Sequence, residues 1–411
     1  MTDREALYRA VLADPDDDTL RLVYADALEE EGDARRAAFI RSQIELARLP
    51  EYDPACVRTR CNGRAYPAAD WVLDLPELPG GLGWSREPFR RGFPAAIDMR
   101  DAAAFVAHAD DLFARFPVES LELAVAQLAH VRAFADCEWL SRLVRLSVSE
   151  GLSGQAATRL LGSEHYQRLR ELHVGAGLTT PATANAVLRS RVFRQLTSLS
   201  CRDDRAGGRT LVEGLTRLTD PPRLKSLDLS GIRLGEHLGR LLAAPALSAV
   251  EELNLGDTNL RSAAVRVIAA ANLPRLRTLH LLRTQPEEAG VHALAGSELF
   301  AGLRSLSLGG NNLPPAAAVS LAGPGAASLR VLDLRENRLG DAGAATLANS
   351  PHLGNLLHLD LATNAIGDAG AEALADSPHL AGLICLDLHG NPLSPAAAAR
   401  LKRRFGDRVF V

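Results

Sequence analysis

The chain has 411 residues, of which 47% are hydrophobic and 23% are charged, so it can bury a large core and is not intrinsically disordered. Its formal net charge of -4 argues against a dedicated nucleic-acid-binding or membrane-surface protein, because such proteins normally carry a basic stripe. No apolar run approaches the roughly 18 to 20 residues needed to cross a bilayer, so we predict neither a nucleic-acid nor a membrane partner.

The N-terminus and the cysteines predict a cytoplasmic protein. Residues 1–5 are polar, and the first apolar residues are spaced as in a helix rather than as in the core of a signal peptide. The five cysteines are odd in number and scattered along the chain, so they do not form a disulfide framework. A reducing compartment is the simplest interpretation.

Residues 1–50 are predicted to form three short amphipathic helices. Thr2 and Glu5 form a capping-box pattern at the start of the first helix. Three acidic residues at 16–18 favour the start of the second, and Gly32 suits the left-handed residue that follows its end. The third ends before Pro50. The residues expected on the buried faces are Leu7, Val11, Leu12, Leu20, Val23, Tyr24, Ala27, Leu28, Phe39, Ile40, Ile44 and Ala47.

The sequence of residues 23–49, VYADALEEEGDARRAAFIRSQIELARL, resembles the repeat-companion domain, a bacterial module that usually precedes leucine-rich repeats. The resemblance implies an association with repeats and assigns no chemistry. Weaker echoes of the family follow at Asp70, Trp71, Arg91, Gly92 and Phe93. The segment between departs from the charged helix that is usual in the family, at Cys56, Cys61, Asn62, Gly63 and Pro67.

Residues 51–92 are rich in proline and glycine and are predicted to be a connector and N-terminal cap. Such a cap is required because the first unit of a repeat array otherwise exposes its core. Trp71 and Trp84 are expected to pack over the first repeat.

Residues 93–411 carry one apolar pattern that recurs eleven times at spacings of 25 to 28 residues. The clearest copies read L-x-x-L-x-L-x-x-N-x-[LI], and positions 4 and 6 alternate as in a short strand with one buried face. Ile97 and Met99 indicate a degenerate unit before the eleven. A fixed period of this length predicts a solenoid. The units begin at Val118, Leu143, Leu169, Leu196, Leu224, Val250, Leu276, Leu303, Leu329, Leu356 and Leu383.

A helix is predicted after each strand, as in the near-identical segments 340–347 and 367–374. Their aspartates can cap the helices, and Gly343 and Gly370 allow close approach to the sheet. These units resemble the ribonuclease-inhibitor class of leucine-rich repeat. The predicted fold is therefore an α/β horseshoe solenoid, with parallel strands inside and helices outside, preceded by the small helical module. Residues 405–411 are predicted to close the last repeat with a strand.

Position 9 of four C-terminal repeats is asparagine, a side chain that can hydrogen-bond the backbone where the chain leaves the strand. The earlier repeats lack this asparagine, and Thr258 and Thr284 are plausible half-substitutes for it. The N-terminal repeats should therefore be less regular. The four asparagines are Asn311, Asn337, Asn364 and Asn391.

No sequence motif predicts a cofactor or a metal. The Walker A, H-E-x-x-H and G-x-S-x-G patterns are absent. Cys56 and Cys61 are the only close cysteine pair, and no histidine lies between residues 1 and 107 to complete a zinc site. His352 and His379 recur in the same S-P-H-L setting, which favours a structural role.

Asp333, Asp360 and Asp387 occupy position 5 of successive repeats, and parallel pairing would stack them as a carboxylate ladder with His358 and His389 nearby. A metal or acid–base site could be built from such groups. However, aspartate is common at this position of the repeat class, where it is simply polar on an exposed strand. We therefore predict no enzyme activity.

Positions 3, 5 and 7 of the eleven repeats place 33 side chains on the predicted concave face. Seven are acidic and three are arginine, which gives a formal charge of -4, and none is aromatic. This predicts a non-enzymatic scaffold that binds a protein with a basic surface. The alternative is a regulator of a small GTPase, because this repeat class also occurs in GTPase-activating proteins. The predicted partner-binding residues are Asp333, Arg335, His358, Asp360, Asp387 and His389.

Overall fold

The computed structural model describes residues 3–61, 71, 74–125, 128–150, 152–175, 180–202, 206–218 and 220–411. It divides into two compact units, Met1–Leu196 and Thr197–Val411, and each is described by itself. The predicted domains 1–50, 51–92 and 93–411 stay a prediction. Some residues named above lie outside the described part of the chain: Thr2, Asn62, Gly63, Pro67 and Asp70.

The first unit begins with helices at the three predicted places and a fourth short helix. Asp17 Oδ1 accepts a hydrogen bond from the backbone N–H of Thr19 at 2.7 Å and so caps the second helix. Gly32 follows that helix with φ of +97°, the left-handed conformation predicted there. The helices are α1 (Asp3–Ala13), α2 (Asp18–Glu30), α3 (Ala34–Arg48) and α4 (Pro54–Cys61).

Helices α1, α2 and α3 share one apolar core with a residue of a later hairpin. Two predicted core residues were wrong: Val23 is 41% exposed and Ala47 is exposed. Val23 lies two positions after Arg21, about 200° around the helix, and Arg21 is on the inner face. Ala47 lies in the last turn of α3, where it lines a pocket. The core cluster is Val11, Ala25, Leu28, Ala37, Ile40, Ile44 and Phe93.

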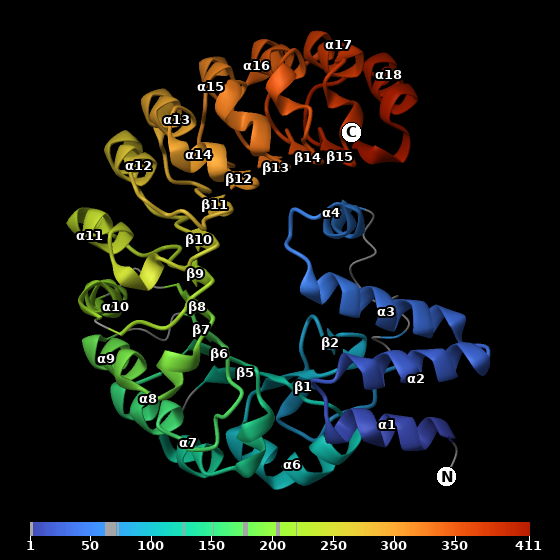
Figure 1. The fold of residues 1–411 in the computed structure, drawn as a ribbon, viewed down its shortest axis with the longest axis vertical. Helices are drawn as coiled ribbons and strands as arrows, with labels where there is room; N and C mark the ends of the chain where they lie inside the picture. Colours follow the sequence, from blue (N-terminus) through green and yellow to red (C-terminus); the bar gives the residue numbers. More distant parts are fainter. Residues whose placement is uncertain are drawn as a thin grey trace. The chain divides into compact units, whose positions relative to one another are not determined.

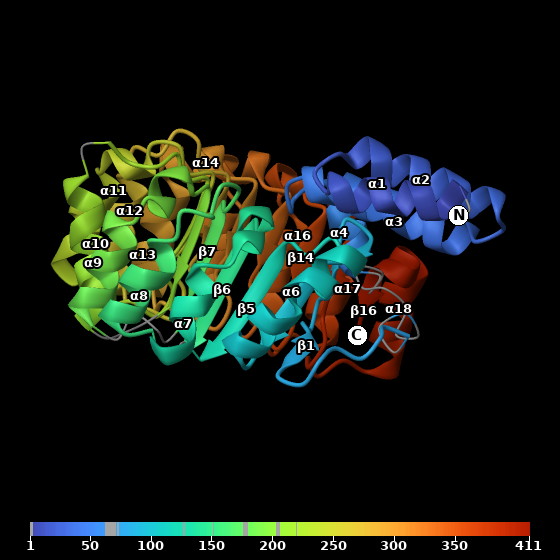
Figure 2. The ribbon, with the colours of Figure 1, turned by 90° about the horizontal axis from the view of Figure 1, so that it is seen from below.

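The sheet of the first unit has the strand order β1-β4-β5-β6-β7. All its pairs are parallel except β1 with β4, and Figure 2 shows β5, β6 and β7 side by side. Because β4 pairs with β5 in the repeat register, the predicted degenerate unit is confirmed. The strands are β1 (Leu82–Trp84), β4 (Ala96–Met99), β5 (Ser120–Val125), β6 (Arg145–Glu150) and β7 (Glu171–Val174), and the helices are α6 (Ala102–Arg115), α7 (Leu128–Ala135), α8 (Gly154–Leu161) and α9 (Pro181–Arg189).

The two connector tryptophans contact different parts of the first unit. Trp84 lies on β1 at the edge of the sheet, and its ring packs edge-on against Phe116 with centroids 5.0 Å apart. Trp71 instead contacts Phe39 of α3, with ring centroids 5.0 Å apart. The expectation that Trp71 packs over the first repeat was therefore wrong. A two-stranded hairpin, β2 (Phe89–Arg90) with β3 (Phe93–Pro94), carries Phe93 into the helical core.

The second unit consists of parallel strands that line one side and helices that line the other (Figure 1). The leucines at position 4 pair in register from Leu199 to Leu386 and are fully buried, as predicted. The strands are β8 (Ser198–Cys201), β9 (Ser226–Asp228), β10 (Glu252–Asn254), β11 (Thr278–His280), β12 (Ser305–Ser307), β13 (Val331–Asp333), β14 (His358–Asp360), β15 (Cys385–Asp387) and β16 (Val409–Phe410). The helices are α10 (Ala206–Arg217), α11 (Leu238–Leu242), α12 (Arg261–Ala269), α13 (Glu287–Ala295), α14 (Glu298–Gly302), α15 (Pro315–Leu321), α16 (Gly340–Ala348), α17 (Asp368–Asp376) and α18 (Pro395–Phe405).

The predicted closing strand is present but shorter than expected. Residue Phe405 still belongs to α18, and Gly406 ends that helix with φ of +62°. Only Val409 and Phe410 then pair with β15 in parallel.

The predicted asparagine ladder is confirmed, and it also joins neighbouring repeats. Asn364 is fully buried, and its Nδ2 donates to the carbonyl oxygen of Leu334 in the preceding repeat at 2.8 Å. Its Oδ1 accepts from the backbone N–H of Leu339 at 3.3 Å. Thr258 donates only within its own repeat, from Oγ1 to the carbonyl oxygen of Leu255 at 2.5 Å. The threonines therefore replace half of what an asparagine does.

Replacing Asn364 with Ala should lower the free energy of unfolding by about 1 to 3 kcal/mol, because two buried backbone groups of the preceding repeat lose their partner. The same change at Thr258 should cost less. Urea unfolding followed by circular dichroism measures both variants. Equal losses at the two sites would show that bridging between repeats adds nothing.

Helix capping also passes between repeats. Asp341 Oδ1, in α16, accepts from the backbone N–H groups of Gly367 and Gly370 at 2.6 and 3.0 Å, at the start of α17. A Cβ at Gly370 would lie 2.7 Å from that oxygen. The glycine therefore permits close approach to the preceding repeat's helix, rather than to the sheet as predicted.

Candidate functional site

The strand register places the predicted carboxylates side by side. Asp333, Asp360 and Asp387 end strands β13, β14 and β15, and each is the direct register partner of the next. We call these three residues the acidic strip. Parallel strands lie about 4.8 Å apart, so three negative charges occupy a very short row.

One oxygen of each carboxylate has a structural role. The Oδ1 atoms of Asp333, Asp360 and Asp387 accept from the backbone N–H two residues later, at 3.1, 3.0 and 2.9 Å. Asn254 makes the same bond to Gly256 at 2.9 Å. A neutral amide therefore satisfies this turn as well as a carboxylate does, and the turn does not require the charge.

Asp360 is the buried member of the acidic strip, with 8% of its surface exposed. Burial raises the pKa of Asp360 to about 6, with further increases from Asp333 and Asp387, while the hydrogen bond from Ala362 and the charge of Arg335 oppose the rise. The middle carboxylate is therefore ionised at pH 7.5 and neutral below about pH 5.

The other predicted residues flank the acidic strip. Arg335 Nε lies 3.7 Å from Asp333 Oδ2, and His389 Nδ1 lies 2.9 Å from Asp387 Oδ1. His358 precedes Asp360 by two residues and pairs in register with Val331 and Cys385. All six predicted residues thus lie on β13, β14, β15 or the turns that follow them.

Two contacts at or beside the acidic strip were not predicted. Ser307 Oγ donates to Asp333 Oδ2 at 2.8 Å, and Phe410 of β16 stacks near His389 with ring centroids 6.1 Å apart. Ser307 stands at position 5 of the preceding repeat, so the repeat register itself could have identified it. Phe410 could not be placed until the closing strand was known to start at Val409.

Acidic residues elsewhere on the strands of the second unit are paired with cations or histidine. Asp228 pairs with Arg202 at 3.0 Å, and Glu252 lies 3.7 Å from His280. The outer two aspartates of the acidic strip lie beside Arg335 and His389, so the strip has three carboxylates but a single arginine. The excess of negative charge is therefore concentrated on the acidic strip.

Cys56 and Cys61 are not placed to bind one metal ion together. Cys56 and Cys61 both lie on α4, and five residues of α-helix separate two side chains by about 140° around the axis. Burial raises the pKa of the Cys56 thiol, which disfavours the thiolate that binds metal. Cys201 is fully buried at an inward strand position and belongs to the core.

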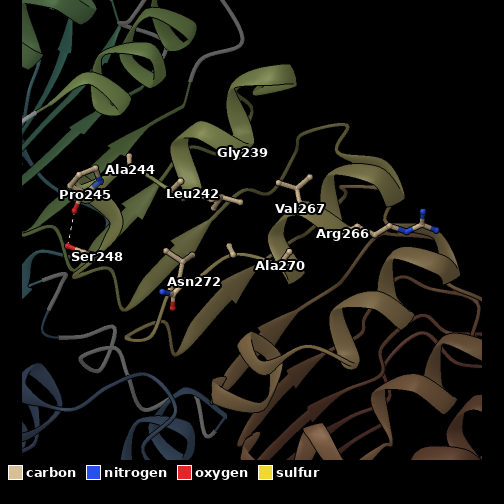
Figure 3. A pocket seen from close by; sticks show the side chains of 12 residues that line it. Gly239, Leu242, Ala244, Pro245, Ser248, Arg266, Val267, Ala270 and Asn272 are labelled. Atoms are coloured by element: carbon tan, nitrogen blue, oxygen red, sulfur yellow. Dashed lines mark hydrogen bonds between the residues drawn. The ribbon is translucent and has the colours of Figure 1, made fainter.

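A hollow of about 680 Å³ lies on the helical side of the second unit, between α11 and α12 (Figure 3). It opens where α11 has only five residues, and Val267 beside it is 42% exposed. Figure 3 shows the Arg266 side chain pointing away from Asn272. The lining is mainly small and apolar, without a group of convergent polar side chains.

Comparisons with known proteins identify leucine-rich repeats near the C-terminus. The sequence model of the Leucine Rich repeat family matches residues 325–348 and 352–375, which contain β13 and β14. No curated protein sequence matches the chain. A chain from the crystal structure of the Rad7 and Elc1 complex in yeast is similar in structure, with 14% sequence identity and a TM-score of 0.47, over 75% of this chain and 83% of that chain. A helix that crosses a bilayer would need more length and apolar character than any described helix has.

Proposed function

We propose that this protein is a non-enzymatic interaction scaffold whose strand face binds a protein with a basic surface. The observation that carries the proposal is the acidic strip, in which three adjacent strands present a row of aspartates. Opposite charge across an interface steers association and selects the partner. The same charge disfavours nucleic acid, which binds to basic surfaces.

The proposal includes three features predicted from the sequence. The repeats curve into a ribonuclease-inhibitor-like horseshoe, so that the strand face is concave and surrounds the partner. The helices of residues 1–50 form a repeat-companion module of bacterial type. The protein acts in the cytoplasm.

Regulation of a small GTPase would use the same face, and nucleotide-hydrolysis assays with a co-purified GTPase would test that alternative.

The test removes the charges while keeping the turns. In the triple variant Asp333→Asn, Asp360→Asn and Asp387→Asn, each amide oxygen can still accept from the backbone, as Asn254 does. Affinity capture from native lysate, with wild type and variant as parallel baits, should lose the basic proteins that the wild type enriches. The Kd of a captured partner should rise at least about tenfold and should be salt-sensitive in the wild type only.

The matched control removes three negative charges from the helical side, with Glu288→Gln, Glu298→Gln and Glu372→Gln, all exposed. This control should bind as the wild type does. A partner that binds the triple Asn variant with unchanged affinity would contradict the proposal. Charge reversal to Lys is the stronger change, but it also removes the turn acceptors.

The stability of the Asn variant distinguishes a direct loss of binding from a loss caused by unfolding. The pKa of Asp360 is raised from 3.8 to about 6 in the folded protein, so Asp360 destabilises the fold above pH 6, and this cost disappears as the pH falls toward 4. The Asp360→Asn change should therefore raise the free energy of unfolding by about 1 to 3 kcal/mol at pH 7.5 and change it little at pH 4.

A further inference from the structure

A pocket of about 650 Å³ lies in the first unit, between the ends of α2 and α3, strand β2 and the first residues of β5, β6 and β7. Leu46, Phe89 and Val144 line its apolar part, and Arg90, Arg145 and Ser120 provide polar groups. This volume is within the range of about 300 to 1,000 Å³ that is typical of small-molecule sites.

Four carboxylates around the pocket, Asp16, Asp18, Glu119 and Glu171, are paired with arginines. Glu119 is nearly buried and accepts from two guanidinium groups, while Asp18 also has two partners. Each of these four carboxylates therefore already has at least one arginine partner. The pairs are Glu119 with Arg21 and Arg91 at 2.7 and 2.6 Å, Asp18 with Arg48 and Arg91 at 2.5 and 3.2 Å, Glu171 with Arg145 at 2.5 Å, and Asp16 with Arg168.

Arg90 is the exception in this arrangement. It is half-buried on β2, and within the described part of the chain its guanidinium has no hydrogen bond and no carboxylate oxygen within 4.0 Å. Burial lowers the pKa of Arg90, and the neighbouring charge of Arg145 lowers it further. A guanidinium that is partly removed from water without a partner costs free energy, which an added anion would recover.

The surroundings of Arg90 specify the type of anion. A guanidinium matches a carboxylate through two parallel N–H···O bonds. Glu87, Glu119 and Glu171 all lie within electrostatic reach of Arg90, so a dianion such as phosphate would be repelled more strongly than a monoanion. Leu46, Phe89 and Val144 offer an apolar surface for the rest of the ligand.

We propose that this pocket binds an organic monocarboxylate, with its carboxylate on the Arg90 guanidinium and its apolar body against Leu46, Phe89 and Val144. The inference is independent of the acidic strip, because the pocket lies in the first unit. Such a carboxylate can come from a free organic acid or from the carboxyl terminus of a peptide.

The test is a titration of the full chain observed by saturation-transfer NMR. Benzoate represents a free acid and N-acetyl-leucine a peptide terminus, while benzamide and inorganic phosphate are the neutral and dianionic comparisons. At least one carboxylate should saturate with a Kd of about 1 mM or below, and benzamide and phosphate should not compete. The proposal is overturned if neither acid binds up to about 10 mM, or if benzamide or phosphate competes equally.

Four variants connect the binding to the pocket. Arg90→Lys should weaken it about tenfold, because an ammonium lacks the two-pronged geometry, and Arg90→Gln should abolish it. Glu87→Gln, at an exposed residue, should strengthen it about threefold by removing a like charge. Arg86→Gln, at an exposed arginine that does not line the pocket, should change nothing.

The tryptophan fluorescence of each variant checks that the first unit remains folded, and the Lys and Glu87 variants still decide the question if Arg90→Gln unfolds. Affinity unchanged by Arg90→Lys and by Glu87→Gln would place the ligand elsewhere.

Discussion

Deletion of residues 401–411 is expected to expose the apolar end of the second unit and to make the protein aggregate. The deletion removes Leu401, Phe405 and Val409, all of which are buried. It also removes β16, so that the edge of β15 loses its partner, including the hydrogen bond from the Leu388 N–H to the Phe410 carbonyl oxygen at 2.7 Å. An open strand edge beside exposed leucines promotes association between chains, and repeat arrays need capped ends for this reason.

Size-exclusion chromatography with light scattering and thermal unfolding would measure the effect. A chain that lacks only Val411, which follows β16, is the matched control and should behave as the full chain does. If the chain without residues 401–411 keeps the oligomeric state and melting temperature of the full chain, α18 and β16 are not the cap.

The fold of the repeats could be predicted because the same apolar pattern recurs in each unit. A leucine at position 4 recurs with each strand from Leu199 to Leu386, and an asparagine at position 9 recurs in four repeats, so one observation is repeated along the chain. Leu332 and Leu359 are buried for the same reason, and Asn337 and Asn364 each donate to a carbonyl oxygen of the preceding repeat. The register of parallel strands then brought Asp333, Asp360 and Asp387 together, as their common position indicated.

The non-repeating part could not be predicted in the same way. Helical periodicity alone placed Val23 in the core, while Arg21, two positions before it on α2, is fully buried. Its partner, Glu119, lies 98 residues further along the chain, and nothing in either local sequence indicates the pair. The pocket beside Arg90 was missed for the same reason, because its groups come from six separate segments.

The Arg21–Glu119 pair is expected to stabilise the first unit. Arg21 is fully buried, donates to the Pro15 carbonyl oxygen at 2.9 Å and to Glu119 at 2.7 Å, and stacks over Phe93 at 4.8 Å. Burial lowers its pKa to about 10, although Glu119 opposes the shift, so Arg21 stays charged at neutral pH. The residue therefore joins α2 to the hairpin and to the residue that precedes β5.

Replacing Glu119 with Gln should lower the free energy of unfolding of the first unit by about 3 to 5 kcal/mol, because a buried cation then lacks its carboxylate. Arg21→Met should cost less, since Glu119 keeps Arg91 at 2.6 Å. The double variant should be more stable than Glu119→Gln alone, because the buried charge is gone. All three tryptophans, Trp71, Trp84 and Trp139, belong to the first unit, so urea unfolding followed by tryptophan fluorescence reports on this unit specifically. If the unfolding free energy lost in the double variant equals the sum of the losses in the two single variants, Arg21 and Glu119 stabilise the fold separately rather than as a pair.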